Sequence, residues 1–170
     1  HMEKLTGNYG IGHVRYPTAG GAGKEFSQPM YVNSPYGISL AHNGNLTNSQ
    51  TLAEELFQAE MRRLNTNSDS EVLLNIFAHE LGKLRKLNPS PEDIFKAVTE
   101  THKRCDGAYA VIALITGFGI LAFRDTNAIR PLSFGIRQGN YRDEYMVASE
   151  DASFISQGFI KERDIEPGEA

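Results

Sequence analysis

Four residues in separate parts of the chain could together hold a free amino acid and activate a carbonyl group on it. They are Arg15, the adjacent pair Asn43 and Gly44, and Asp69. A guanidinium binds a carboxylate well, often through two parallel hydrogen bonds, and an anion binds an ammonium group. Two aimed N–H donors stabilise the oxyanion that a carbonyl becomes under attack. These residue types predict a site for a small zwitterion with a reactive side-chain carbonyl.

Each candidate also has an ordinary structural interpretation. Arg15 is expected at a strand end, where a surface arginine is the commoner role, and Thr18 is equally a turn hydroxyl or a second anion-binding group. Asn43-Gly44 is a typical hairpin turn, but a helical pattern follows it, which favours two donors that converge on one oxygen. A carboxylate at Asp69, in the first turn of a helix, gains about 0.3–1 kcal/mol from the helix dipole whatever the function.

Composition predicts one globular domain in the cytoplasm. The 170 residues are 40% hydrophobic and 22% charged, with a net charge of −4 that argues against a nucleic-acid surface. No apolar run approaches the roughly 18–20 residues of a membrane span. Cys105 is the single cysteine, so an internal disulfide and a cysteine-based zinc site are excluded, and it is interpreted as inert. No residue cluster has metal-ligand spacing, so no metal site is predicted.

The ends of the chain are interpreted as cut. His1 and Met2 are typical of a cloning remnant, which leaves residues 3–170 as the domain. The segment that follows Met2 has no natural beginning, and the chain stops just after a turn.

Hydrophobic periodicity and turn residues predict an α+β fold. Helices are expected after Thr47-Asn48, after a capping box at Ser68-Asp69-Ser70-Glu71, and after Ser90-Pro91-Glu92-Asp93, with Phe95 inward. Strands are expected at residues 9–16, 36–42, 108–116, 118–124, 131–136 and 145–149, with a loop at 20–24, a short helix at 151–156 and a last extended segment near 164–165. Two strand groups that flank a block of helices indicate layered, largely antiparallel sheets.

Five segments closely resemble the amidophosphoribosyltransferase family. They are residues 12–20, residues 28–38 (all but Met30 matching, as Gln28-Pro29 and residues 31–38), residues 41–46, residues 68–71 and residues 148–150. The resemblance runs from about residue 7 to residue 170 and covers only the glutaminase domain of the family. Tyr16-Pro17 after the arginine separates the chain from the related amino-sugar synthases, which usually have tryptophan there.

The resemblance implies a four-layer αββα sandwich of the N-terminal-nucleophile hydrolase type, here lacking its first strand and helix. It implies that Arg15 and Thr18 hold the carboxylate of glutamine, that Asp69 holds its ammonium group, and that Asn43 and Gly44 form the oxyanion hole. In the family a terminal cysteine thiolate attacks the glutamine amide. The ammonia released passes to a phosphoribosyltransferase domain, absent here, which makes phosphoribosylamine from phosphoribosyl pyrophosphate in the first step of de novo purine synthesis. Magnesium is expected only with that domain.

The chain departs from the family pattern in three places. It begins at His1 rather than cysteine, so this fragment is expected to be inactive. The usual Asp-Pro-Asn-Gly turn is Asp125-Thr126-Asn127-Ala128, where alanine at a glycine position is expected to reshape the turn. The usual Ser-Glu-Ser is Ser149-Glu150-Asp151. Missing early strands are expected to expose sheet edges that favour self-association into homo-oligomers.

Two other hypotheses stay open at this stage. One is the glutaminase domain of a different glutamine amidotransferase, such as an amino-sugar or asparagine synthase. The other is a non-catalytic remnant that binds an amino acid or serves as a scaffold for a protein partner. Neither hypothesis involves a nucleic acid or a membrane.

Overall fold

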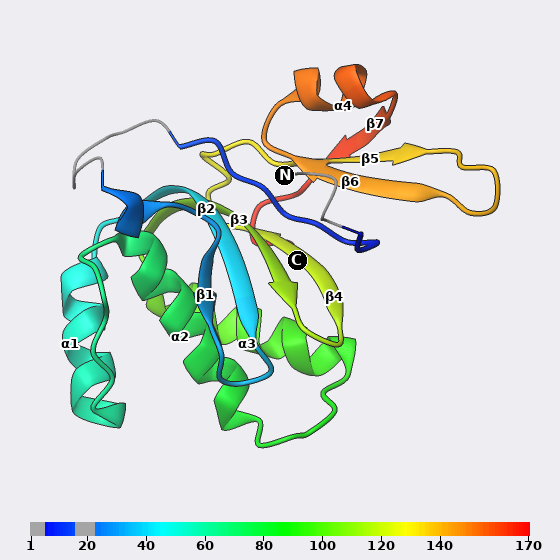
Figure 1. Ribbon diagram of the computed structural model, residues 1–170. Helices are drawn as coiled ribbons and strands as arrows, with labels where there is room; N and C mark the ends of the chain where they lie inside the picture. Colours follow the sequence, from blue (N-terminus) through cyan, green and yellow to red (C-terminus); the bar gives the residue numbers. More distant parts are fainter. Residues whose placement is uncertain (1–5, 16–22) are drawn as a thin grey trace.

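The computed structural model describes residues 6–15 and 23–170, which form an α+β fold with two antiparallel sheets and four α-helices (Figure 1). In chain order the elements are η2 (Lys24–Phe26), β1 (Met30–Val32), β2 (Ile38–Leu46), α1 (Ser49–Glu60), α2 (Asp69–Lys83), α3 (Pro91–Arg104), β3 (Gly107–Ile115), β4 (Gly119–Arg124), β5 (Ser133–Arg137), β6 (Glu144–Ala148), α4 (Asp151–Gln157) and β7 (Ile160–Asp164). None of the described helices has the length and apolar character needed to cross a membrane.

The strands form a four-stranded sheet in the order β1-β2-β3-β4 and a three-stranded sheet in the order β6-β5-β7. Every pairing is antiparallel. The longest runs between β2 and β3, from Ile38 opposite Ile115 to Leu46 opposite Gly107. The α+β class with antiparallel sheets is therefore confirmed.

Helices α1, α2 and α3 cover one face of the four-stranded sheet, and the main core lies between them (Figure 1). The rings of Phe77 on α2 and Phe123 on β4 are fully buried there, with centroids 5.7 Å apart. The opposite face meets the three-stranded sheet through a smaller cluster that contains Ala110, Leu132 and Ile165. Helix α4 lies on the outer side of the three-stranded sheet, where a Cβ at Gly135 would come within 2.7 Å of the Phe154 ring.

The strand predicted at residues 9–16 is wrong for residues 9–15, which belong to no strand; Tyr16 lies outside the described residues. Tyr9 and Val14 are 65% and 97% exposed, so the apolar pattern there serves no core within the described chain. The predicted loop at residues 20–24 is described only from Gly23 onward. Strand β1 was not predicted, because three residues bounded by prolines carry too little pattern to indicate a strand.

Helix starts agree with the predictions, but their capping differs in detail. Ser90 and Asp93 form a complete capping box at the start of α3. At α2, Ser68 caps the helix by accepting a hydrogen bond from the Ser70 N–H, while Glu71 turns away from it. The Glu71 carboxylate accepts hydrogen bonds from the backbone N–H groups of Asn65 and Thr66 instead, at 2.8 and 2.7 Å. The predicted capping box at residues 68–71 is therefore wrong.

The prediction that Phe95 on α3 points inward is also wrong, because its side chain is 44% exposed.

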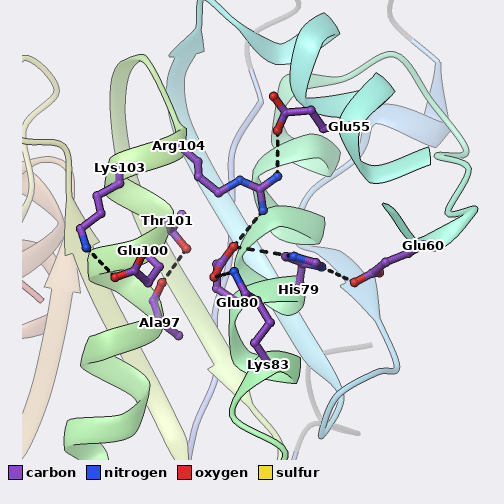
Figure 2. A network of polar contacts seen from close by, with 10 residues as sticks. All are labelled: Glu55, Glu60, His79, Glu80, Lys83, Ala97, Glu100, Thr101, Lys103 and Arg104. Atoms are coloured by element: carbon purple, nitrogen blue, oxygen red, sulfur yellow. Dashed lines mark hydrogen bonds and ion pairs between the residues drawn. The ribbon is translucent and has the colours of Figure 1, made fainter. Parts of the chain in front are cut away.

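A network of ion pairs joins the three helices of the main layer (Figure 2). Glu80 on α2 has a side chain only 2% exposed, and it pairs with Arg104 on α3 at 2.8 Å and with Lys83 at 2.7 Å. Arg104 reaches Glu55 on α1 at 3.0 Å. Burial raises the pKa of Glu80, but hydrogen bonds from Lys83 and Arg104 outweigh it and lower the pKa below its ordinary value. The network thus keeps a buried carboxylate charged.

We expect Arg104→Met to lower the free energy of unfolding by about 1–3 kcal/mol, because it removes one partner of a buried charge. Lys103→Met is the matched control: Lys103 also lies in the last turn of α3, but its pair with Glu100 is exposed. The control should cost less than about 1 kcal/mol. Urea unfolding measures both, and equal losses would contradict the buried-pair interpretation.

Candidate functional site

Strand β2 has an edge that β1 covers only in part. Strand β1 pairs with Ile38 to Leu40, and β2 continues to Leu46 beyond that point. The backbone N–H of His42 donates to Gln28 Oε1 at 2.6 Å, and the N–H of Leu46 donates to Asp69 Oδ2 at 3.0 Å. Two side chains from other elements therefore complete the hydrogen bonding that a neighbouring strand would otherwise provide.

Asn43 and Gly44 lie inside β2 rather than at a turn or at the end of the strand. They pair with Ala110 and Tyr109 of β3, so the prediction that the strand ends at residue 42 is wrong. Gly44 has a φ of +151°, and a Cβ there would lie 1.9 Å from the carbonyl oxygen of Ala108. The close approach of β3 thus requires glycine at this position, which is the reason for a pair that is otherwise typical of turns.

The alternation of N–H directions along an antiparallel strand assigns the Gly44 N–H an orientation. The N–H groups of His42 and Leu46 point to the partly covered edge, so the N–H of Gly44, midway between them, faces the same edge. The side chain of Asn43 is fixed at its oxygen, since Arg130 Nη2 donates to Oδ1 at 2.8 Å. The Nδ2 group is then the end of this amide that can donate to a ligand.

Asp69 is the first residue of α2 and is half-buried. Its carboxylate accepts a hydrogen bond from the N–H of Leu46 at the end of β2. Ser68, not Asp69, caps the helix. The bond to Leu46 holds a negative group beside the edge that the Gly44 N–H faces. The structure thus bonds Asp69 to the same strand that carries Asn43 and Gly44, two of the other predicted site residues.

His42 lies beneath this edge and is 3% exposed. Its Nδ1 is 2.9 Å from Ser70 Oγ, and its Nε2 has no hydrogen-bond partner within the described part of the chain. Burial lowers the pKa of His42 to about 4; Asp69 opposes this shift, whereas His13 and Arg130 add to it. The His42 imidazole is therefore neutral near pH 7.

Arg15 is half-buried, and its guanidinium carbon lies 5.1 Å from the centroid of the Phe26 ring. It is not at the end of a strand, so that part of the prediction is wrong. Burial, followed by the charge of Arg15, lowers the pKa of His13, and His13 in turn acts on His42. Thr18 lies outside the described residues.

The segment 125–130 between β4 and β5 adds a residue that sequence reasoning did not select. Buried Asp125 accepts hydrogen bonds from the N–H of Tyr109 at 3.0 Å and of Asn127 at 2.9 Å. Ala128 adopts a left-handed conformation with φ +50°, a shape that favours glycine. The expectation that alanine reshapes the turn relative to the family stays a prediction. The turn places Arg130 in contact with Asn43, which lies 87 residues earlier in the sequence. No local sequence pattern predicts this contact.

Cys105 ends α3 and is buried, and burial raises the pKa of its thiol to about 12. A thiol with that pKa holds almost no thiolate near neutrality, which agrees with the inert role expected for it. Within residues 6–15 and 23–170, no group of three or more histidine, cysteine or acidic side chains could hold a metal ion.

The chain has relatives among known proteins. Residues 21–156 match a family model described as the glutamine amidotransferase domain. The whole chain is 59% identical over 170 residues to an amidophosphoribosyltransferase of Pseudomonas aeruginosa and 54% identical over 171 residues to that of Escherichia coli K12. In each case it spans 34% of the length of the relative.

A solved structure has a similar fold. It is the glutamine phosphoribosylpyrophosphate amidotransferase of Bacillus subtilis, determined in complex with ADP and GMP. The match has a TM-score of 0.69 and 32% sequence identity, and it covers 91% of this chain and 30% of that one.

His42 should make the domain acid-sensitive. Because its folded pKa of about 4 lies below the ordinary 6.5, the unfolded chain takes up a proton first as the pH falls. Above pH 6.5 His42 does not change the free energy of unfolding. Between pH 6.5 and about 4 it lowers that free energy progressively, by on the order of 1–3 kcal/mol. We expect His42→Asn, which keeps a polar atom near Ser70, to flatten that part of the curve. Urea unfolding at several pH values measures the slopes, and parallel curves would contradict this role.

Ala128→Gly should raise the free energy of unfolding by up to about 1 kcal/mol, because glycine adopts the left-handed conformation without steric cost. Ala152→Gly is the control. Ala152 is exposed within α4, where the same change should lower the free energy of unfolding by about 1 kcal/mol. Denaturant titration should give shifts of opposite sign; a loss at both positions would show that the turn is not strained.

Proposed function

The chain belongs to the glutamine amidotransferase domain family, in the form carried by amidophosphoribosyltransferases, and from this premise we propose that it binds glutamine at the partly covered edge of β2 and helps release its amide nitrogen as ammonia. One observation carries the proposal: the Asp69 carboxylate is bonded to the same strand edge that the Gly44 N–H faces. An anion for the ammonium group and a donor for the carbonyl oxygen thus lie along the same strand edge.

The spacing along the strand supports these roles. Asp69 bonds Leu46, two residues beyond Gly44, which is about 7 Å along an antiparallel strand. This separation is close to the reach of an extended glutamine from its ammonium group to its amide oxygen. In the proposal Asp69 holds the ammonium group, and Asn43 Nδ2 and the Gly44 N–H hold the oxyanion. Arg15 and Thr18 hold the carboxylate of glutamine.

The nucleophile is the part that the described site does not contain. In the family, a cysteine thiolate at the mature N-terminus attacks the amide carbon. Cys105, the one cysteine of this sequence, is buried with a thiol pKa of about 12 and does not meet that requirement. We therefore propose that the 170-residue chain alone releases no ammonia from glutamine.

The layer contacts support the N-terminal-nucleophile type of fold for this domain. The main core joins α1, α2 and α3 to the four-stranded sheet, the smaller cluster joins the two sheets, and α4 packs on the outer side of the second sheet. In the proposal these contacts are the four layers of an αββα sandwich.

The domain works, in this proposal, within a longer cytoplasmic amidophosphoribosyltransferase. Ammonia passes from the site to a phosphoribosyltransferase domain, which uses magnesium and forms phosphoribosylamine from phosphoribosyl pyrophosphate at the start of purine synthesis. The support is that the chain matches about a third of proteins named for this reaction.

Asp69→Asn tests the proposal in that longer protein. Asparagine can still accept the hydrogen bond from Leu46 but loses the charge, so the KM for glutamine should rise roughly ten- to hundredfold. The rate with added ammonia, which bypasses the site, should stay unchanged. Steady-state phosphoribosylamine formation with each nitrogen source measures both.

Asp143→Asn, an exposed change on the β5–β6 loop, is the control and should alter neither rate. An unchanged KM in Asp69→Asn would remove Asp69 from the glutamine site. Glutamine-dependent ammonia release without any use of phosphoribosyl pyrophosphate would point to a different acceptor. Ammonia release by the 170-residue chain that disappears in Cys105→Ala would overturn the proposed inactivity.

A further inference from the structure

We propose that Arg130 is a positioning residue that orients the Asn43 side-chain amide for oxyanion binding. The inference rests on the proposed function and concerns a residue outside the set that the sequence indicates. Arg130 lies between β4 and β5, and its Nη2 donates to Asn43 Oδ1 at 2.8 Å. Because the donor is charged, this hydrogen bond is stronger than one between neutral groups.

A primary amide needs such a partner to present the correct end. The Asn43 amide has an accepting oxygen and a donating NH₂ group, and a half-turn about its last torsion exchanges them. With the oxygen turned toward the substrate, it would repel the negative charge that develops on the glutamine carbonyl. A guanidinium can only donate, so it binds the oxygen and leaves Nδ2 for the substrate. Donation to Oδ1 also polarises the amide and strengthens its N–H donors.

The backbone that carries Arg130 is held firmly. Arg124 Nε donates to the carbonyl of Arg130 at 2.6 Å, and its Nη2 donates to the carbonyl of Ala128 at 2.5 Å. Arg124 Nη1 reaches the carbonyl of Ile165 at 2.8 Å, which ties the turn to the chain after β7. Arg130 itself is exposed, so its fixed direction comes from this backbone rather than from packing of its side chain.

The same turn also braces the second donor of the proposed oxyanion hole. Asp125 binds the N–H of Tyr109, and Tyr109 is the residue opposite Gly44 in the β2–β3 register. One segment therefore supports Asn43 through Arg130 and supports the strand beside Gly44 through Asp125. During attack, sulfur bonds to the amide carbon and the carbonyl electron pair moves to oxygen. Arg130 transfers no proton in this step and acts only through the direction and polarity of the Asn43 amide.

Arg130→Met in the longer enzyme tests the inference. Since oxyanion contacts tighten in the transition state, kcat with glutamine should fall about tenfold to hundredfold, while the KM for glutamine stays within about twofold. The rate with added ammonia should not change, and Arg130→Lys should recover part of the loss. Arg142→Met, an exposed arginine on the β5–β6 loop, is the matched control and should leave all rates unchanged.

A double-mutant cycle separates positioning from direct substrate binding. If Arg130 acts through Asn43, then Arg130→Met should have no further effect in a protein that already carries Asn43→Ala. A multiplied loss in the double variant, or a rise in KM with kcat unchanged, would overturn the inference. The inference would also be overturned if the wild-type enzyme uses glutamine and the Arg130→Met variant has the same kcat. The proposed function would then remain supported. A wild-type enzyme unable to use glutamine would defeat both.

Discussion

The partly covered edge of β2 is the constraint on which the candidate site depends. Beyond Leu40, the strand presents N–H groups that β1 does not reach, and an unpaired N–H that is removed from water costs about 1–3 kcal/mol. The amide of Gln28 and the carboxylate of Asp69 satisfy the groups at His42 and Leu46. A requirement of folding thereby places a negative charge at the strand edge that the Gly44 N–H faces. The contact that stabilises the strand is also the one on which the proposed glutamine site depends.

Helix α2 turns this local arrangement into a rigid one. Most of its residues are buried, because the sheet lies on one side and α1 and α3 lie on others. Burial on several faces would be unfavourable for Glu80 if the pairs with Arg104 and Lys83 did not compensate its charge. With the body of the helix fixed, its first residue, Asp69, is fixed as well. The distant ion pairs in Figure 2 and the position of the proposed ammonium-binding group thus belong to the same packed unit.

The turn between β4 and β5 shows how a polar loop can be as well defined as a strand. Its shape depends on Asp125 and Arg124, which occupy backbone groups on both sides of the turn, and it tolerates Ala128 in a left-handed conformation. The side-chain contacts here hold an alanine in a geometry that glycine would adopt freely. The result is a guanidinium held at a fixed place beside Asn43.

The sequence by itself determined the helices, most of the strands and the types of chemical group at the site. Helical periodicity, the helix start at Ser90-Pro91 and the apolar run of β3 depend on neighbours within a few residues, so the sequence indicates them directly. Only the tertiary structure decided that Asn43-Gly44 is strand rather than turn. Glycine is required there because Ala108 of β3 lies too close for a Cβ. It also decided the bonds of Asp69 to Leu46 and of Arg130 to Asn43, which join residues 23 and 87 positions apart. Such contacts follow from strand register and helix packing, and no local pattern records them.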